Sequence, residues 1–152
     1  MLFDPKHDER LAKLEEQLRC ADVVTSGLMS DVMATACVRF VTLEAATKVR
    51  VKWLIEAGAW TDATIALLEL ELPQWKLRRL VKEDRKWLCS LSKHMGIPLA
   101  YDEVAEADHE SLQLAILIAL VQAKRSAGTS GIATVPPVRR VPTNAAYCDN
   151  FG

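Results

Sequence analysis

The sequence predicts an α+β protein: an N-terminal αα-hairpin, then a two-layer unit of helix, antiparallel β-hairpin of two or three strands, and helix. Three observations predict this class. Apolar residues recur at helical spacing through most of residues 5–57 and again over residues 109–124. Between them, residues 75–93 alternate with period two around a polar turn, which is typical of a β-hairpin. From residue 126 onward, glycine and proline become frequent and large apolar residues rare.

The αα-hairpin is expected to contain two helices, over about residues 5–22 and 30–57. Asp4 followed by Pro5 is a typical N-cap with proline at the first helical position, and Gly58 is suited to end the second helix. Glu44 and Thr47 interrupt the apolar face of the second helix. The second helix is therefore either one long helix or two shorter ones.

The two-layer unit begins with a helix from about Thr61 to Pro73, because proline stops a helix. The hairpin turns at residues 83–86, and the pair Arg78-Arg79 breaks its alternation, which predicts a bulge. A third strand is expected near residues 103–107. We expect Asp108 to cap a last helix over residues 109–124. The predicted division is 1–58 for the helical hairpin, 59–125 for the sandwich-like unit and 126–152 for a disordered tail.

Charge is sorted along the two-layer unit. Residues 75–93 contain seven basic and two acidic residues, whereas residues 101–110 contain five acidic residues and no lysine or arginine. The overall net charge of −1 hides this difference. The basic hairpin is either an exposed surface for an acidic partner or is neutralised by the acidic segment lying against it, and the sequence leaves both interpretations open.

Several kinds of chemistry lack the residues that they need. The four cysteines form no CxxC pair, and the three histidines are scattered among them without ligand spacing, so we expect no metal and no cofactor. No phosphate-binding glycine motif occurs. No uncharged apolar run reaches 18 residues, and the first ten residues are charged, so we expect a cytoplasmic protein without membrane contact.

Three stretches carry a resemblance: DATIALLELELPQWKLRRL, KWLCSL and ADHESLQLAILIALVQAKR. In this order they resemble the phage ABA sandwich domains, and the resemblance covers residues 62–125. It implies a helix, antiparallel strands and a second helix, and it transfers no catalytic residue. The chain as a whole is also similar to small uncharacterised alphaproteobacterial proteins, which implies a bacterial origin.

These observations predict a small non-enzymatic module that self-associates or binds a protein partner. Its contact surface would be the apolar stripe of the helical hairpin, formed by Leu14, Leu18, Met33, Cys37, Phe40 and Val51. The alternative is a nucleic-acid-associated accessory protein that uses the basic hairpin through Lys76, Arg78, Lys82, Arg85 and Lys86. An enzyme whose site forms only between subunits is a third interpretation.

Overall fold

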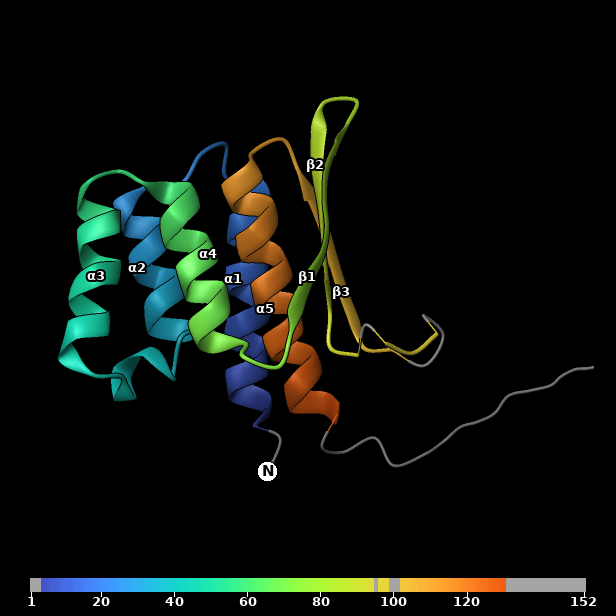
Figure 1. The fold of residues 1–152 in the computed structure, drawn as a ribbon, viewed down its shortest axis with the longest axis horizontal. Helices are drawn as coiled ribbons and strands as arrows, with labels where there is room; N and C mark the ends of the chain where they lie inside the picture. The colour runs from blue at the N-terminus through green and yellow to red at the C-terminus, as the bar shows by residue number, and fades with distance from the viewer. Residues whose placement is uncertain (1–3, 95, 99–101, 131–152) are drawn as a thin grey trace, which may run out of the picture.

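The protein is described by a computed structural model over residues 4–94, 96–98 and 102–130. The chain folds into helices and an antiparallel sheet, which confirms the predicted α+β class (Figure 1). In order, the elements are α1 (Pro5–Cys20), α2 (Ser26–Thr35), the 3₁₀ turn η1 (Phe40–Thr42), α3 (Ala45–Glu56), α4 (Trp60–Glu71), β1 (Lys76–Glu83), β2 (Lys86–Ser92), β3 (Val104–His109) and α5 (Leu112–Ser130).

Helix α1 begins as its sequence predicts. The Asp4 carboxylate accepts a hydrogen bond from the Lys6 backbone N–H at 3.0 Å, and Pro5 occupies the first turn. The leucines that recur at helical spacing, Leu11, Leu14 and Leu18, are all buried. The helix therefore presents one narrow apolar face to the rest of the protein and leaves its other faces to solvent.

The second predicted helix is two helices separated by η1, so the single long helix is wrong and the alternative of two shorter ones is confirmed. Helix α2 begins earlier than expected, because the Thr25 hydroxyl accepts a hydrogen bond from the Leu28 N–H and caps it. The polar interruption at Glu44 marks the N-cap of α3. Gly58, with φ of 74°, ends α3 as expected, since this left-handed conformation favours glycine.

The predicted hairpin and its bulge are both confirmed. Strands β1 and β2 pair antiparallel, and the register shifts between Leu77 and Arg79, so that Arg78 is the extra residue. The two-residue turn contains Asp84, whose φ of 58° lies in the left-handed region. Strand β3 pairs antiparallel with β2, so the sheet order is β1-β2-β3 and both β1 and β3 are edge strands.

The beginning and the end of the last helix differ from the prediction. Strand β3 continues through Asp108 to His109, because the alternation of buried Ala105 and Ala107 with exposed Glu106 and Asp108 extends that far. Helix α5 therefore begins at Leu112, and Asp108 does not cap it. The same helix continues to Ser130, so residues 126–130 are helical rather than part of a tail, and residues 131–152 lie outside the described residues.

Within the described residues, helices α1 to α5 all lie on one side of the sheet (Figure 1). Helix α5 packs against β2 and β3 on its sheet side and against α1 and α4 on its other sides, while α2 and α3 are farther from the sheet. Every residue of α5 from Leu114 to Val121 is buried, which is the wide apolar face that the sequence indicates. Helix α5 is therefore the centre of the hydrophobic core.

Ion pairs between α1 and α5 add to this packing. The Arg125 guanidinium lies 3.2 Å from the Asp8 carboxylate and 3.0 Å from that of Glu15, which also pairs with Arg19 at 2.8 Å. Burial alone would raise the pKa of Glu15, but hydrogen bonds from Arg19, Gln122 and Arg125 outweigh it and lower that pKa. Helix α1 and helix α5, which are far apart in the sequence, thus share one core.

Candidate interaction surface

The sheet has one face covered by helices and one face without them. We call the second face the outer face. The pairing register places these side chains on it: from β1 Arg79, Val81 and Glu83, from β2 Lys86, Leu88, Ser90 and Ser92, and from β3 Val104, Glu106 and Asp108. The opposite face carries Cys89 and Leu91 beside Ala105 and Ala107, and all four are buried. Among the described residues no helix covers the outer face (Figure 1).

The acidic segment lies beside the central strand and does not cover the whole hairpin. Lys86 pairs with Asp108 at 3.5 Å, and Lys93 pairs with Glu103 at 3.6 Å, so β3 partly neutralises the lysines of β2 and its end. Strand β1 is on the far side of β2. Its Arg79 pairs with Glu83 of the same strand at 3.8 Å, and no acidic residue of β3 pairs with β1 within the described ranges. The acidic segment therefore neutralises part of the basic hairpin, and whether strand β1 binds an acidic partner stays a prediction.

Ser90 lies at the centre of the outer face, between Arg79 of β1 and Glu106 of β3. Its side chain is fully buried, and within the described part of the chain its Oγ has no hydrogen-bond partner. An unpaired buried hydroxyl costs about 1–3 kcal/mol. Ser92, the next outward residue, differs, because its hydroxyl donates to the Asp102 carboxylate.

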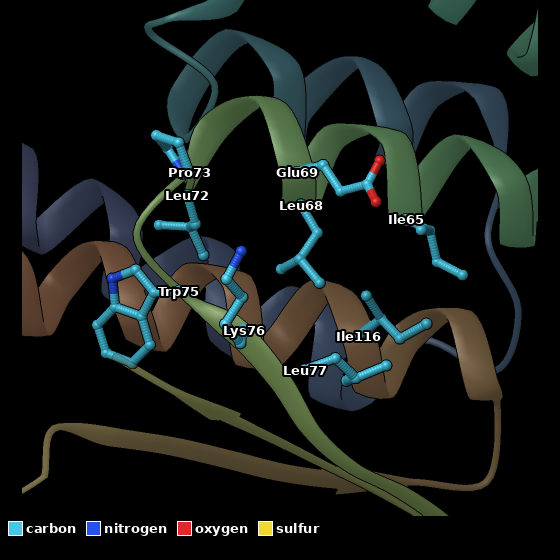
Figure 2. Close-up of a pocket in the computed structure, with 9 residues that line it drawn as sticks. All are labelled: Ile65, Leu68, Glu69, Leu72, Pro73, Trp75, Lys76, Leu77 and Ile116. Atoms are coloured by element: carbon cyan, nitrogen blue, oxygen red, sulfur yellow. The ribbon is translucent and has the colours of Figure 1, made fainter. Parts of the chain in front are cut away.

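The five predicted basic residues do not share one face. Lys86 is on the outer face, Lys76 lines a groove beside α4 (Figure 2), Arg78 is at the bulge, and Arg85 is in the turn. Lys82 is on the other face, opposite Trp87, with its ammonium 5.8 Å from the ring centroid. All five are exposed, and they are divided among the two faces of the sheet, the bulge and the turn.

The predicted self-association stripe belongs to the core of the protomer. Leu14, Leu18, Cys37, Phe40 and Val51 are buried, and Met33 is partly buried against them. Helices α4 and α5, which come later in the chain, help to cover these residues. A buried side chain cannot contact a second copy without local unfolding, so a contact surface must be formed by other residues.

The cysteines and histidines also have structural explanations. Burial raises the pKa of both Cys37 and Cys89 to about 12, so neither thiol is a nucleophile at neutral pH. His109 uses both ring nitrogens: Nε2 contacts the Ala21 carbonyl at 2.9 Å, and Nδ1 accepts from the Ser111 N–H at 2.8 Å. Across the described ranges, no cluster of three or more possible metal ligands forms.

The sequence analysis missed Glu71. Its carboxylate is fully buried and accepts hydrogen bonds from the N–H groups of Arg39 and Phe40, at 3.2 and 2.6 Å, and from the Lys124 ammonium at 2.8 Å. Glu71 follows Thr64 and Leu67 on one face of α4, at spacings of seven and four residues, and both are buried. A carboxylate on an otherwise apolar helical face is the sequence pattern that could have identified this site.

The fold and the outer face define a small α+β protein with an open-faced, three-stranded antiparallel sheet. No protein-family model matches the chain, and no curated protein or solved structure shows significant similarity to it. Within the described ranges, none of the helices has the length and apolar character needed to cross a membrane. The function must therefore be argued from the surface itself.

Proposed function

We propose that this protein is a non-enzymatic module that self-associates, and that two copies pack through the outer faces of their sheets. One observation supports this most: among the described residues no helix covers the outer face, and its charges differ between the two edges. Strand β1 contributes one cation and one anion, Arg79 and Glu83, while β3 contributes only anions, Glu106 and Asp108. Symmetric dimers bury the same surface of both copies, so that surface must complement itself.

Charge selects one arrangement of the two copies. If the two-fold axis runs parallel to β2, then β1 of one copy lies over β3 of the other, and Arg79 meets Glu106 across the axis. If the axis runs perpendicular to β2, then like strands face each other, and the acidic strand β3 meets a second β3. Like charges in contact destabilise an interface, so the proposal uses the parallel axis.

The centre of the face suits a close approach. Leu88 and Ser90 lie on the central strand and are shorter than the arginine, lysine and glutamate side chains beside them. Leu88 also lines a cavity of about 470 Å³ together with Glu83, Lys86 and Asp108. In the proposed dimer, Leu88, which is partly exposed, meets its own copy along the axis.

The area of the face sets the strength of this dimer. Three strands about 4.8 Å apart and roughly 20 Å long cover on the order of 300 Å². A standard stable interface buries about 800 Å² per partner. We therefore expect a weak dimer that forms as concentration rises and dissociates more readily in high salt.

Two charge reversals test the arrangement. Arg79→Glu and Glu106→Arg each place like charges opposite each other at two symmetric positions, and each should weaken dimerisation by about 30-fold, or roughly 2 kcal/mol. Mixing the two variants restores an opposite charge at both positions, so the mixture should form heterodimers. Sedimentation velocity between about 5 and 500 μM measures all three samples.

The matched control is Lys52→Glu, an exposed reversal on α3, away from the sheet. It should leave the association unchanged. A monomeric wild-type protein at the highest concentration would refute self-association, and two reversals that fail to recover on mixing would refute this arrangement. Fluorescence anisotropy with oligonucleotides at low salt tests the alternative. In that case Lys82→Glu should remove nucleic-acid binding and leave the dimer intact.

A further inference from the structure

Helix α3 has an exposed apolar ridge on the side that faces away from the core. The helix packs against α4 and is the one farthest from the sheet (Figure 1). Its two buried residues, Val51 and Leu54, lie on the inner side. Val49 and Trp53 lie on the opposite side, one helical turn apart, and each is 63% exposed.

Two small residues extend this ridge. Ala46 precedes Val49 by three positions and Ala57 follows Trp53 by four, and both alanines are exposed. We call these four residues the α3 ridge. It runs about 16 Å along the helix axis, which is roughly three turns. Small side chains at both ends let a second helix approach to the usual interaxial distance of about 8–10 Å, so the ridge has the length and shape that helix–helix packing uses.

Trp53 differs from the other tryptophans of the chain, all four of which are among the described residues. Trp75 is buried, and Trp60 and Trp87 are partly buried against the core. The Trp53 side chain is mostly outside the core, although a tryptophan offers up to about 250 Å² of surface for burial. Tryptophan is also one of the residue types that most often dominate the binding energy of protein interfaces. Trp53 therefore has the exposure and the chemistry of an interface anchor.

Arg50 and Lys52 stand on the two flanks of the ridge. At roughly 100° per residue, each lies about 80° from the line of the ridge, one on either side. Both are exposed, and neither forms an ion pair with a described residue. Helix α3 has three basic residues and one acidic residue, Glu56, which lies in its last turn. The flanks of the middle turns are therefore positive, and they complement a partner with acidic flanks.

We propose that α3 binds an amphipathic helix of another protein, whose apolar side chains cover Val49 and Trp53 and whose flanks carry glutamate or aspartate. A second copy of α3 fits less well, because both helices would carry the same excess of positive charge. An anionic membrane also fits less well, because its recognition by charge uses about four to eight basic residues. The α3 ridge is on neither face of the sheet, so this proposal is independent of the proposed dimer.

Fluorescence anisotropy with a labelled peptide tests the proposal. The probe is a 16-residue helical peptide with leucines along one face and glutamates on both flanks, and the comparison peptide has lysines in place of the glutamates. The α3 ridge is smaller than a standard interface, so we expect weak binding of the glutamate peptide, with Kd on the order of 100 μM at low salt. The lysine peptide should bind the wild-type protein at least about tenfold more weakly.

Two variants separate the apolar anchor from the charges. Trp53→Ser should weaken binding of the glutamate peptide by about 30-fold, as the loss of an interface anchor does. Arg50→Glu together with Lys52→Glu should weaken it by about tenfold and should make the lysine peptide the tighter ligand. This exchange of preference requires a folded α3, so loss of folding cannot imitate it. The matched control is Val23→Ser, at a residue that is also 63% exposed but lies outside α3, and it should change nothing.

Four results would overturn the proposal. The first two are no binding of the glutamate peptide at about 1 mM, and equal binding of the two peptides. The third is self-association that Trp53→Ser removes and Arg79→Glu leaves intact, which would assign the ridge to a second copy. The fourth is sedimentation with phosphatidylserine vesicles that depends on Trp53, which would assign it to a membrane. Arg79→Glu should leave peptide binding unchanged, so failure of the proposed dimer and failure of this proposal are distinguishable.

Discussion

Replacing Glu71 with alanine should destabilise the protein more than any other single change to a charged residue of α4. The carboxylate connects three parts of the chain: the turn that begins at Phe40, helix α4 on which it lies, and Lys124 of α5. Alanine leaves two backbone N–H groups and a lysine ammonium without their acceptor. None of these donors has water to replace the lost partner at no cost, because the site is buried.

The size of the effect follows from the type of pair. Removing one partner of a buried ion pair costs about 3–5 kcal/mol, and a single hydrogen bond to a charged group contributes about 1.5–3 kcal/mol. We therefore expect Glu71→Ala to lower the free energy of unfolding by about 4 kcal/mol, out of a typical total of 5–15 kcal/mol. Glu71→Gln keeps the shape and one acceptor, so its cost should be about half as large.

Urea denaturation followed by tryptophan fluorescence and circular dichroism measures these differences. The matched control is Glu69→Ala, two residues earlier on the exposed side of α4, which should change the stability by less than about 0.5 kcal/mol. The double variant Glu71→Ala with Lys124→Met should be more stable than Glu71→Ala alone, because no buried ammonium remains unpaired. If the free energy of unfolding of Glu71→Ala lies within 1 kcal/mol of the wild-type value, the carboxylate does not hold these elements together.

Three further predictions concern other parts of the protein. Because the pKa of Glu15 is lowered in the folded protein, its contribution to the free energy of unfolding is complete above the unfolded pKa near 4.5 and is lost as pH falls through the lower folded pKa. A Glu15→Gln variant whose stability falls just as steeply on acidification would refute this. Cys20 is exposed, so native alkylation should modify it and spare Cys37 and Cys89; rapid modification of either buried thiol would contradict their raised pKa values. Asp84→Gly should raise the stability by about 0.5 kcal/mol by relieving the left-handed backbone, and a lower urea midpoint would contradict this.

Local patterns predicted the parts of the fold that local chemistry decides. The cap at Asp4, the glycine at residue 58 and the bulge at Arg78 depend on residues within one turn or one strand pair, and all three are present. The break between α2 and α3 was harder to place. Cys37 and Phe40 continue the apolar pattern through it, and the partner of the turn is Glu71, more than 30 residues away.

The candidate site was less predictable, for a physical reason. Helical spacing identifies an apolar face but not what covers it, so the stripe from Leu14 to Val51 was equally compatible with a second copy and with the core. Two later helices provide the cover: α4 packs against η1 and α3, and α5, about 60 residues after the stripe ends, packs against α1. The outer face was hard to predict for another reason. Its charged residues alternate along each strand with residues of the other face, and the sequence of one strand does not show which charges on neighbouring strands lie side by side.

The order of the strands decides how far apart the basic and acidic residues lie in the folded protein. Because β2 lies between β1 and β3, charges that are separated along the chain are also separated across the sheet, by two strand spacings or about 10 Å. At that distance two opposite charges near a protein surface attract by roughly 0.4–1.7 kcal/mol, against about 1–4 kcal/mol at 4 Å. The lysines of β2 reach the acidic strand within one protomer, but Arg79 does not reach Glu106. A second copy turned about an axis parallel to β2 would bring these two charges into contact, so self-association would add Glu106 as a second partner to Arg79, which within one copy pairs with Glu83.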